Sequence, residues 1–150
     1  MKKLLIALLF PVLLCAQGEL IVKKSDWTTD YKTAVKKAEK EDKNILVFFT
    51  GSDWCPPCIA LKKDFFETAS FDTYAKEYVL LYIDIPRNRD LLSADQLAHN
   101  KELASKYNKR GSVPMIKILN DNGKELGALS GYSMNGEIQY HTKFLDKYYK

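Results

Sequence analysis

Hydrophobic and polar positions follow two different spacing patterns along the chain, and each pattern predicts one type of secondary structure. In "DYKTAVKKAEKEDK", the apolar residues Tyr31, Ala34, Val35 and Ala38 fall at helical spacing, so we expect an amphipathic helix. Two unbroken apolar runs, "NILVFF" and "YVLLYIDI", predict strands that are buried on both faces of a sheet. A helical crossover joins these runs, so we expect the two strands to be parallel neighbours.

Three further stretches predict helices. "PPCIALKKDFFETAS" begins with two prolines, which a first helical turn tolerates because its N–H groups have no partner in the helix. A Ser93–Gln96 capping-box pattern precedes the helical stretch "KELASKY", for which Asn100 is a further candidate cap, and the tail "NGEIQYHTKFLDKYY" predicts a final helix.

The remaining apolar stretches predict strands. "ELIVKKSDW" contains a short one, while "VPMIKIL" and "LGALSGY" flank "NDNGKE", an Asn-Gly turn that is typical of a β-hairpin. Helices and strands in this order predict one α/β domain whose central mixed sheet is flanked by helices on both faces.

The start of the chain is typical of a targeting segment. Lys2 and Lys3 precede an apolar run from Leu4 to Ala16, and these 13 residues are fewer than the roughly 20 that span a bilayer. We expect residues 1–18 to be a secretory signal peptide and residues 19–150 to be the mature domain, with cleavage after Ala16 as the alternative. The protein would then be secreted across an inner membrane, into the periplasm.

Cys15 offers an alternative, in which a lipoprotein signal is cut before it and the chain is anchored by a lipid. Leu14 stands where such signals carry a small residue, so we expect Cys15 to leave with the signal, and membrane association only if Cys15 is lipidated. The mature chain then holds two cysteines, in a compartment where disulfides can form.

Charge excludes one class of partner. The chain has 23 basic and 19 acidic residues, and removal of Lys2 and Lys3 leaves 21 against 19, a formal charge of +2. This excess is too weak for nucleic acid to be an expected partner.

The candidate chemistry lies in "GSDWCPPC", where Cys55 and Cys58 stand between a buried strand and the start of a helix. The positive end of a helix dipole favours a thiolate at the first cysteine. The second lies about one helical turn further in, close enough to form a disulfide with the first. We therefore expect a pair that cycles between dithiol and disulfide.

Other uses of the pair fit less well. A c-type haem would need a histidine after Cys58, where Ile59 stands, and a zinc site would need further ligands, for which only the distant His99 and His141 remain. A purely structural disulfide would gain little from closing so short a loop. We expect no cofactor other than the redox-active disulfide itself.

At this point the chain resembles the thioredoxin family. The motif Trp54-Cys55-x-x-Cys58, then Val113-Pro114, then Gly131 follow one another in the family's order, and the likeness covers nearly all of the mature chain. It is most similar to secreted bacterial thioredoxin-like proteins with a "GSDWC" opening, which act as thiol–disulfide oxidoreductases. The resemblance implies a thioredoxin fold.

The resemblance also implies roles for particular residues. Cys55 would be the nucleophile and Cys58 the resolving thiol, and a cis Val113–Pro114 bond would face them. The expected substrate-binding residues are Trp54, Pro56, Pro57, Val113 and Pro114.

Three positions depart from the family pattern. The buried aspartate that usually lies beneath the resolving cysteine is replaced by Phe48 or Phe49, and Asp84, after the next strand, is a weak substitute. The dipeptide Pro56-Pro57 deletes an N–H near the thiolate, and the apolar Ile59 follows the motif.

These observations predict a thiol–disulfide oxidoreductase that reduces protein disulfides and is recycled by a redox partner. A disulfide-forming oxidase and a non-catalytic binding or chaperone module are the alternatives. The polar segment from Ile85 to Asn100 follows the second buried strand, so we expect it beside the motif, with Arg87 and Arg89 at a rim that favours acidic partners. The alternative is a loop that only connects two elements.

Overall fold

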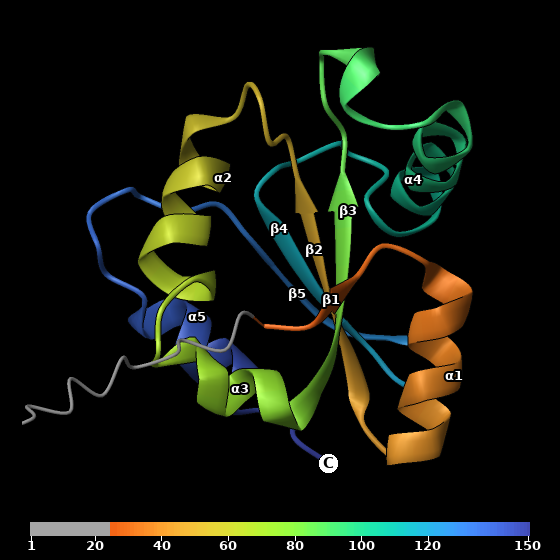
Figure 1. Ribbon diagram of the computed structural model, residues 1–150. Coiled ribbons are helices and arrows are strands. Elements are labelled where there is room, and N and C mark those ends of the chain that lie inside the picture. Colours follow the sequence, from red (N-terminus) through yellow and green to blue (C-terminus); the bar gives the residue numbers. More distant parts are fainter. Residues whose placement is uncertain (1–24) are drawn as a thin grey trace, which may run out of the picture.

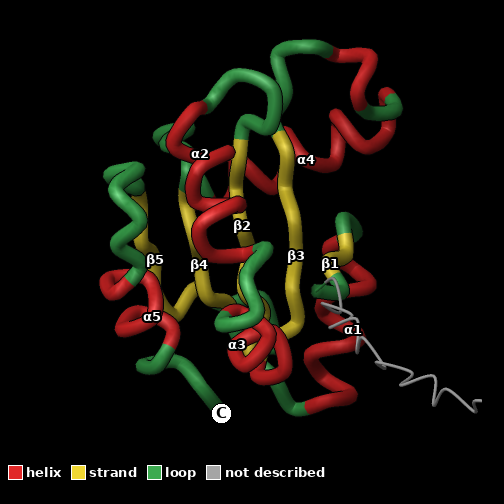
Figure 2. Tube along the Cα trace, turned by 60° about the vertical axis from the view of Figure 1, so that its left-hand side comes forward, coloured by secondary structure: helices red, strands yellow, loops and turns green. Residues whose placement is uncertain are grey.

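The computed structural model describes residues 25–150, so the expected signal peptide and Cys15 lie outside the described residues. A five-stranded sheet runs through this part in the order β1-β3-β2-β4-β5 (Figure 2). The strands are β1 (Trp27–Thr28), β2 (Asn44–Thr50), β3 (Tyr78–Asp84), β4 (Met115–Leu119) and β5 (Glu125–Ser130). The first three run parallel to one another, whereas β4 and β5 are antiparallel to their neighbours, which confirms the expected mixed sheet.

Helices cover both faces of this sheet (Figure 1). On one face lie α2 (Pro56–Leu61), α3 (Phe71–Glu77) and α5 (Gln139–Leu145), and on the other lie α1 (Tyr31–Glu41) and α4 (Ala94–Tyr107). A π-helical turn, η1 (Lys62–Phe66), extends α2, and a short 3₁₀ turn, η2 (Arg89–Leu91), precedes α4. Among the described residues, no helix is long and apolar enough to cross a membrane.

The central strand β2 is buried along its whole length, as its unbroken apolar run predicted. Its side chains alternate between two cores: Leu46 and Phe48 pack toward α2, α3 and α5, and Val47 and Phe49 pack toward α1 and α4. Since strand side chains point alternately to opposite faces, a strand between two helical layers must be apolar at every position. The run "NILVFF" therefore supplies apolar side chains to both cores.

β2 and β3 are parallel neighbours, as expected, and their last residues, Thr50 and Asp84, lie in register. The loop with the cysteines follows β2, and the segment that begins at Ile85 follows β3, so both leave the sheet at the same edge (Figure 1). This register brings the two segments side by side.

Two expectations about helices were wrong. The crossover between β2 and β3 contains a second helix, α3, which sequence analysis did not predict and which buries Phe71. Asn100 does not cap a helix: α4 begins after Ser93, whose hydroxyl accepts from the N–H of Gln96 as the capping-box pattern predicted, and it continues through Asn100. The side chain of Asn100 is buried and donates to the backbone oxygen of Asp84 over 2.8 Å, so it joins α4 to the end of β3.

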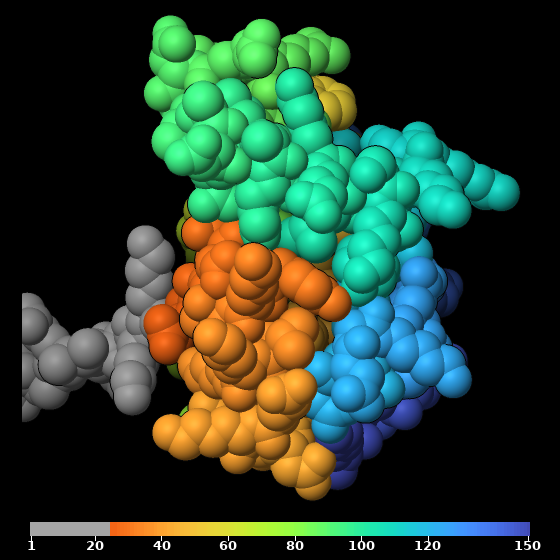
Figure 3. Space-filling view, turned by 90° about the vertical axis from the view of Figure 1, so that its right-hand side faces the viewer, coloured from red at the N-terminus to blue at the C-terminus, as the bar shows by residue number. Residues whose placement is uncertain are grey.

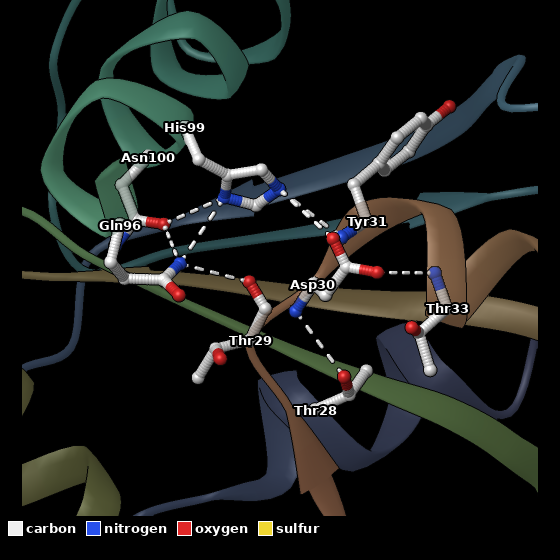
Figure 4. A network of polar contacts seen from close by, with 8 residues as sticks. All are labelled: Thr28, Thr29, Asp30, Tyr31, Thr33, Gln96, His99 and Asn100. Carbon is white, nitrogen blue, oxygen red and sulfur yellow. Dashed lines mark hydrogen bonds and ion pairs between the residues drawn. The ribbon is translucent and has the colours of Figure 1, made fainter.

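A polar network around His99 continues this junction toward α1 (Figure 4). The His99 ring nitrogen Nε2 accepts from the backbone N–H of Tyr31, the first residue of α1, over 3.2 Å. The amide Nε2 of Gln96 donates to the backbone oxygen of Thr29 and to the side chain of Asn100. These hydrogen bonds thus join the first turns of α4, which follow the segment after β3, to both α1 and the sheet.

Candidate functional site

The two cysteines form a disulfide where β2 ends and α2 begins. Their Cα atoms are 5.3 Å apart, and Cys55 occupies the N-cap position, where its sulfur accepts from the N–H of Cys58 over 3.3 Å. Cys55 is 4% exposed and Cys58 is 1% exposed. The first cysteine therefore lies nearer the surface and receives the N–H of the first helical turn, which favours it over Cys58 as the attacking thiolate.

Pro56 and Pro57 fill the first helical turn between the cysteines. Proline has no backbone N–H, so neither residue can donate to the sulfur of Cys55. Pro56 is exposed and Pro57 is half-buried, and Ile59, which follows Cys58, is 51% exposed. The surface beside the disulfide is therefore apolar, and it supplies few hydrogen bonds to a thiolate.

The Val113–Pro114 peptide bond is cis, which confirms the expectation from the resemblance. β4 begins directly after Pro114, and Phe49 near the end of β2 pairs with Met115 at the start of β4. The carbonyl oxygen of Pro114 accepts from the N–H of Gly131 over 2.9 Å. Antiparallel pairing thus places the cis bond at the edge of the sheet where the cysteine loop leaves β2.

Trp54 is half-buried and directly precedes the disulfide. Its Nε1–H donates to the backbone oxygen of Ile85 over 2.8 Å, and the guanidinium carbon of Arg87 lies 4.7 Å from the centre of its ring. Arg87 therefore lies beside the cysteine loop, as the sequence predicted. The indole is held between its own loop and the segment after β3.

Two carboxylates join these same segments. Asp53 accepts from the backbone N–H groups of Arg87 and Asn88 over 3.0 and 2.8 Å, and these bonds lower the pKa of Asp53 below its ordinary value. Asp84 is buried, and its carboxylate accepts from both the backbone N–H and the hydroxyl of Ser52. These bonds thereby hold the loop before the cysteines against the end of β3 and against the segment that follows it.

Sequence analysis did not identify the roles of Ser52 and Asp53. Their only signal was that two short polar side chains follow a buried strand, a pattern that is common in turns. Asp84 was considered as a substitute for the aspartate missing beneath Cys58, but its carboxylate is bonded to Ser52. Phe48 and Phe49 are fully buried, as expected, so neither of the usual positions supplies a carboxylate.

The histidines lie in other parts of the fold. His99 belongs to the network between α4 and α1, and His141 in α5 is buried against Tyr132 and Phe65. Desolvation by burial lowers the pKa of His141, and the backbone of Gly131 partly opposes this effect. Among residues 25–150, no cluster of three or more histidine, cysteine or carboxylate side chains could hold a metal ion.

Comparison with known proteins relates this arrangement to disulfide chemistry. The chain is 28% identical to the disulfide bond reductase DsbH of Chlamydia pneumoniae over 114 residues, which cover 75% of this chain and 67% of DsbH. It is 26% identical to the thioredoxin-related protein DsbJ of the same organism over 133 residues, and spans only 36% of that longer protein.

Solved structures show the same fold. A DsbH oxidoreductase superposes with a TM-score of 0.73 at 25% identity, covering 88% of this chain and 90% of the other. A thioredoxin from Thermus thermophilus superposes with a TM-score of 0.60 at 17% identity, covering 83% and 86%. Residues 26–121 match the family described as Thioredoxin-like. With its paired cysteines and its mixed sheet, the chain belongs to the thioredoxin-like family.

Proposed function

We propose that this protein is a thiol–disulfide oxidoreductase that reduces disulfides in protein clients through Cys55 and Cys58. The observation that carries the proposal is the disulfide itself, which lies at the edge of the sheet beside the cis Val113–Pro114 bond. The similarity to the DsbH reductase, which extends over 75% of the chain, supports the direction of electron flow.

In the reduced protein, the thiolate of Cys55 attacks one sulfur of the client disulfide. A mixed disulfide forms, and the other client sulfur leaves as a thiolate. The thiolate of Cys58 then attacks the sulfur of Cys55, which releases the second client thiol and closes the Cys55–Cys58 disulfide. Two electrons pass to the client, so a dithiol donor must reduce the pair before the next cycle.

The surroundings of the disulfide favour a reductase over an oxidase. A strongly oxidising pair needs a heavily stabilised thiolate. Here the prolines remove two N–H donors, and the exposed Ile59 makes the neighbouring surface apolar, so the thiolate of Cys55 receives little stabilisation. A binding module, in contrast, would have no use for two joined thiols.

Trp54, Pro56, Pro57, Val113 and Pro114 form the substrate surface in this proposal. Trp54 offers a flat apolar wall on one side of the cysteines. An extended client segment would form backbone hydrogen bonds with Val113, which stands between the bonded carbonyls of Ser112 and Pro114.

Replacement of single cysteines tests the proposal. With a dithiol donor and a protein disulfide substrate, Cys55→Ser should abolish reduction, whereas Cys58→Ser should accumulate a mixed disulfide that mass spectrometry detects. Cys58→Ser can still attack but cannot resolve. Undiminished turnover by Cys55→Ser would refute the redox function and support the binding module. Net formation of disulfides in a reduced client, without reduction of oxidised ones, would support the oxidase.

We further propose that the protein works outside the cytoplasm, after residues 1–18 are removed. The basic start and the short apolar run support a secretory signal. The mass of the mature chain tests this: removal of residues 1–18 predicts an unmodified N-terminus at Glu19. A diacylated N-terminal cysteine at position 15 would instead establish the lipid anchor.

A further inference from the structure

A small pocket lies between the end of β3, the segment after it and the first turns of α4. Its volume is about 180 Å³, and its lining residues are Asp84, Ile85, Pro86, Arg87, Arg89, Leu97 and Lys101. We call this the β3–α4 pocket. The segment that forms it rises above the sheet at the same end as the cysteine loop (Figure 1), and it makes up the green top of the molecule in Figure 3.

Charge in this pocket is unbalanced. Its lining residues include three cations, Arg87, Arg89 and Lys101, and one carboxylate, Asp84, which is a formal excess of two positive charges. The carboxylate of Asp84 already accepts two bonds from Ser52. Within residues 25–150, none of the three cations has a carboxylate oxygen within 4.0 Å. The pocket therefore favours an anion.

The three cations are exposed, and the pocket walls beside them are apolar. Ile85, Pro86 and Leu97 supply this apolar surface, and Leu97 is 9% exposed. A bound side chain can pack its apolar stem against it. An arginine fork also matches the two oxygens of a carboxylate. A glutamate or aspartate side chain fits this combination, because an apolar stem ends in a planar anion.

The pocket shares a wall with the redox site. Arg87 lines the pocket and also lies over the ring of Trp54, which directly precedes Cys55. Asp53 fixes the backbone of Arg87 and Asn88 against the cysteine loop. A side chain held in the pocket therefore belongs to a chain that passes close to the disulfide.

We infer that the β3–α4 pocket binds an acidic side chain of the client polypeptide, next to the cysteine that Cys55 attacks. This inference rests on the proposed function and names the class of client that the site prefers. A free carboxylate in solution would bind at this small pocket alone, and therefore weakly. A carboxylate on the client is concentrated at the pocket by the second contact at Cys55, so the weak interaction becomes effective.

Matched peptide disulfides test the inference. Two series carry a single glutamate or a single glutamine at successive positions around the cysteine, and kcat/KM is measured for each. For the best position, the glutamate peptide should be reduced about 2- to 5-fold faster than its glutamine partner, the range expected for exposed charge pairs. Added salt should lower this ratio because it screens the charges.

Variants locate the effect. Arg89→Gln and Lys101→Gln should each bring the ratio of the two rates toward one, and Lys124→Gln, an exposed lysine in the β4–β5 turn, should leave the ratio at the wild-type value. Equal rates for both series in the wild-type protein would overturn the inference while leaving the proposed reductase function intact. A ratio that persists in Arg89→Gln/Lys101→Gln would place the preference elsewhere and also overturn it.

A binding experiment separates failure of the inference from failure of the proposed function. Serine replaces cysteine in both peptides, and the backbone amide signals of the protein are followed by NMR. Shifts at Arg89 and Lys101 with the glutamate peptide alone would support the inference even if no peptide is reduced. If acetate shifts these signals as far at the same concentration, the pocket is a site for small anions and the inference fails.

Discussion

The indole Nε1–H of Trp54 donates a 2.8 Å hydrogen bond to the backbone oxygen of Ile85. Trp54 directly precedes Cys55, and Ile85 is the first residue after β3. The same two segments are joined by Asp53 to the N–H of Asn88 and by Asp84 to Ser52. The cysteine loop is therefore positioned by the segment that follows β3 as well as by its own helix, α2.

Gly51→Ala should displace the indole of Trp54. A methyl group on Gly51 would overlap the indole ring, so the bond to Ile85 cannot persist with the ring in place. We expect a loss of about 1–3 kcal/mol in the free energy of unfolding, the usual cost of overpacking, and a changed NMR signal for the indole N–H. Trp54→Phe, which keeps an aromatic ring but has no N–H, should cost about 0.5–1.5 kcal/mol. An unchanged indole signal in Gly51→Ala would contradict this account.

Ser52 and Asp84 should be energetically coupled. Asp84 is buried and accepts from the N–H and the hydroxyl of Ser52, so each single substitution removes part of the same interaction. A double-mutant cycle with Ser52→Ala and Asp84→Ala, measured by urea denaturation, should give an interaction energy of about 1–2 kcal/mol. Ser105→Ala, which removes an exposed hydroxyl bonded within α4, serves as the control in place of Ser52→Ala. Additive costs for Ser52 and Asp84 would refute the coupling.

Cys55 should titrate as a moderately activated thiol. Its sulfur accepts from the N–H of Cys58, but Pro56 and Pro57 supply no donor and the exposed Ile59 supplies no charge. Ultraviolet absorbance of the reduced protein should therefore show thiolate formation with a midpoint above about pH 5, since strongly oxidising pairs titrate near the bottom of the activated range. Pro56→Gly restores an N–H and should lower the midpoint. A wild-type midpoint below that limit would indicate an oxidase.

The stability of the fold should fall in mild acid because of His141. Burial lowers the pKa of His141 in the folded protein below the ordinary 6.5 of an unfolded chain. As the pH falls below 6.5, the unfolded state binds a proton at this histidine and the folded state does not. The free energy of unfolding therefore decreases, and it stops decreasing once the pH is below the lowered pKa of the folded state. Urea denaturation at a series of pH values should show this slope.

His141→Phe should remove that loss of stability, because phenylalanine keeps an aromatic ring against Tyr132 and does not titrate. His99→Gln, which leaves His141 unchanged, should retain the part of the slope that belongs to His141. If His141→Phe loses stability in acid as steeply as the wild type, another group is responsible.

The sequence by itself determined which strands are buried on both faces of the sheet, and it determined the nature of the redox pair. Local spacing suffices for both: an unbroken apolar run places β2 between two cores, and a two-residue gap in the first turn of a helix brings Cys55 within bonding distance of Cys58. The resemblance to the thioredoxin family added the cis Val113–Pro114 bond, which no periodicity encodes. The parallel order of β2 and β3 also placed the segment with Arg87 beside the cysteine loop.

Only the tertiary structure decided what surrounds the pair. Asp84 and Ser52 are 32 residues apart in the chain, and Asn88 lies 35 residues after Asp53, so no local pattern links them. Asn100 looked like a helix cap, because a polar residue before a helical stretch has that meaning locally. In the fold it is buried in mid-helix and bonds to the backbone of Asp84. Local pattern does not name the partner of a buried polar side chain, so these bonds become defined only when packing brings distant segments together.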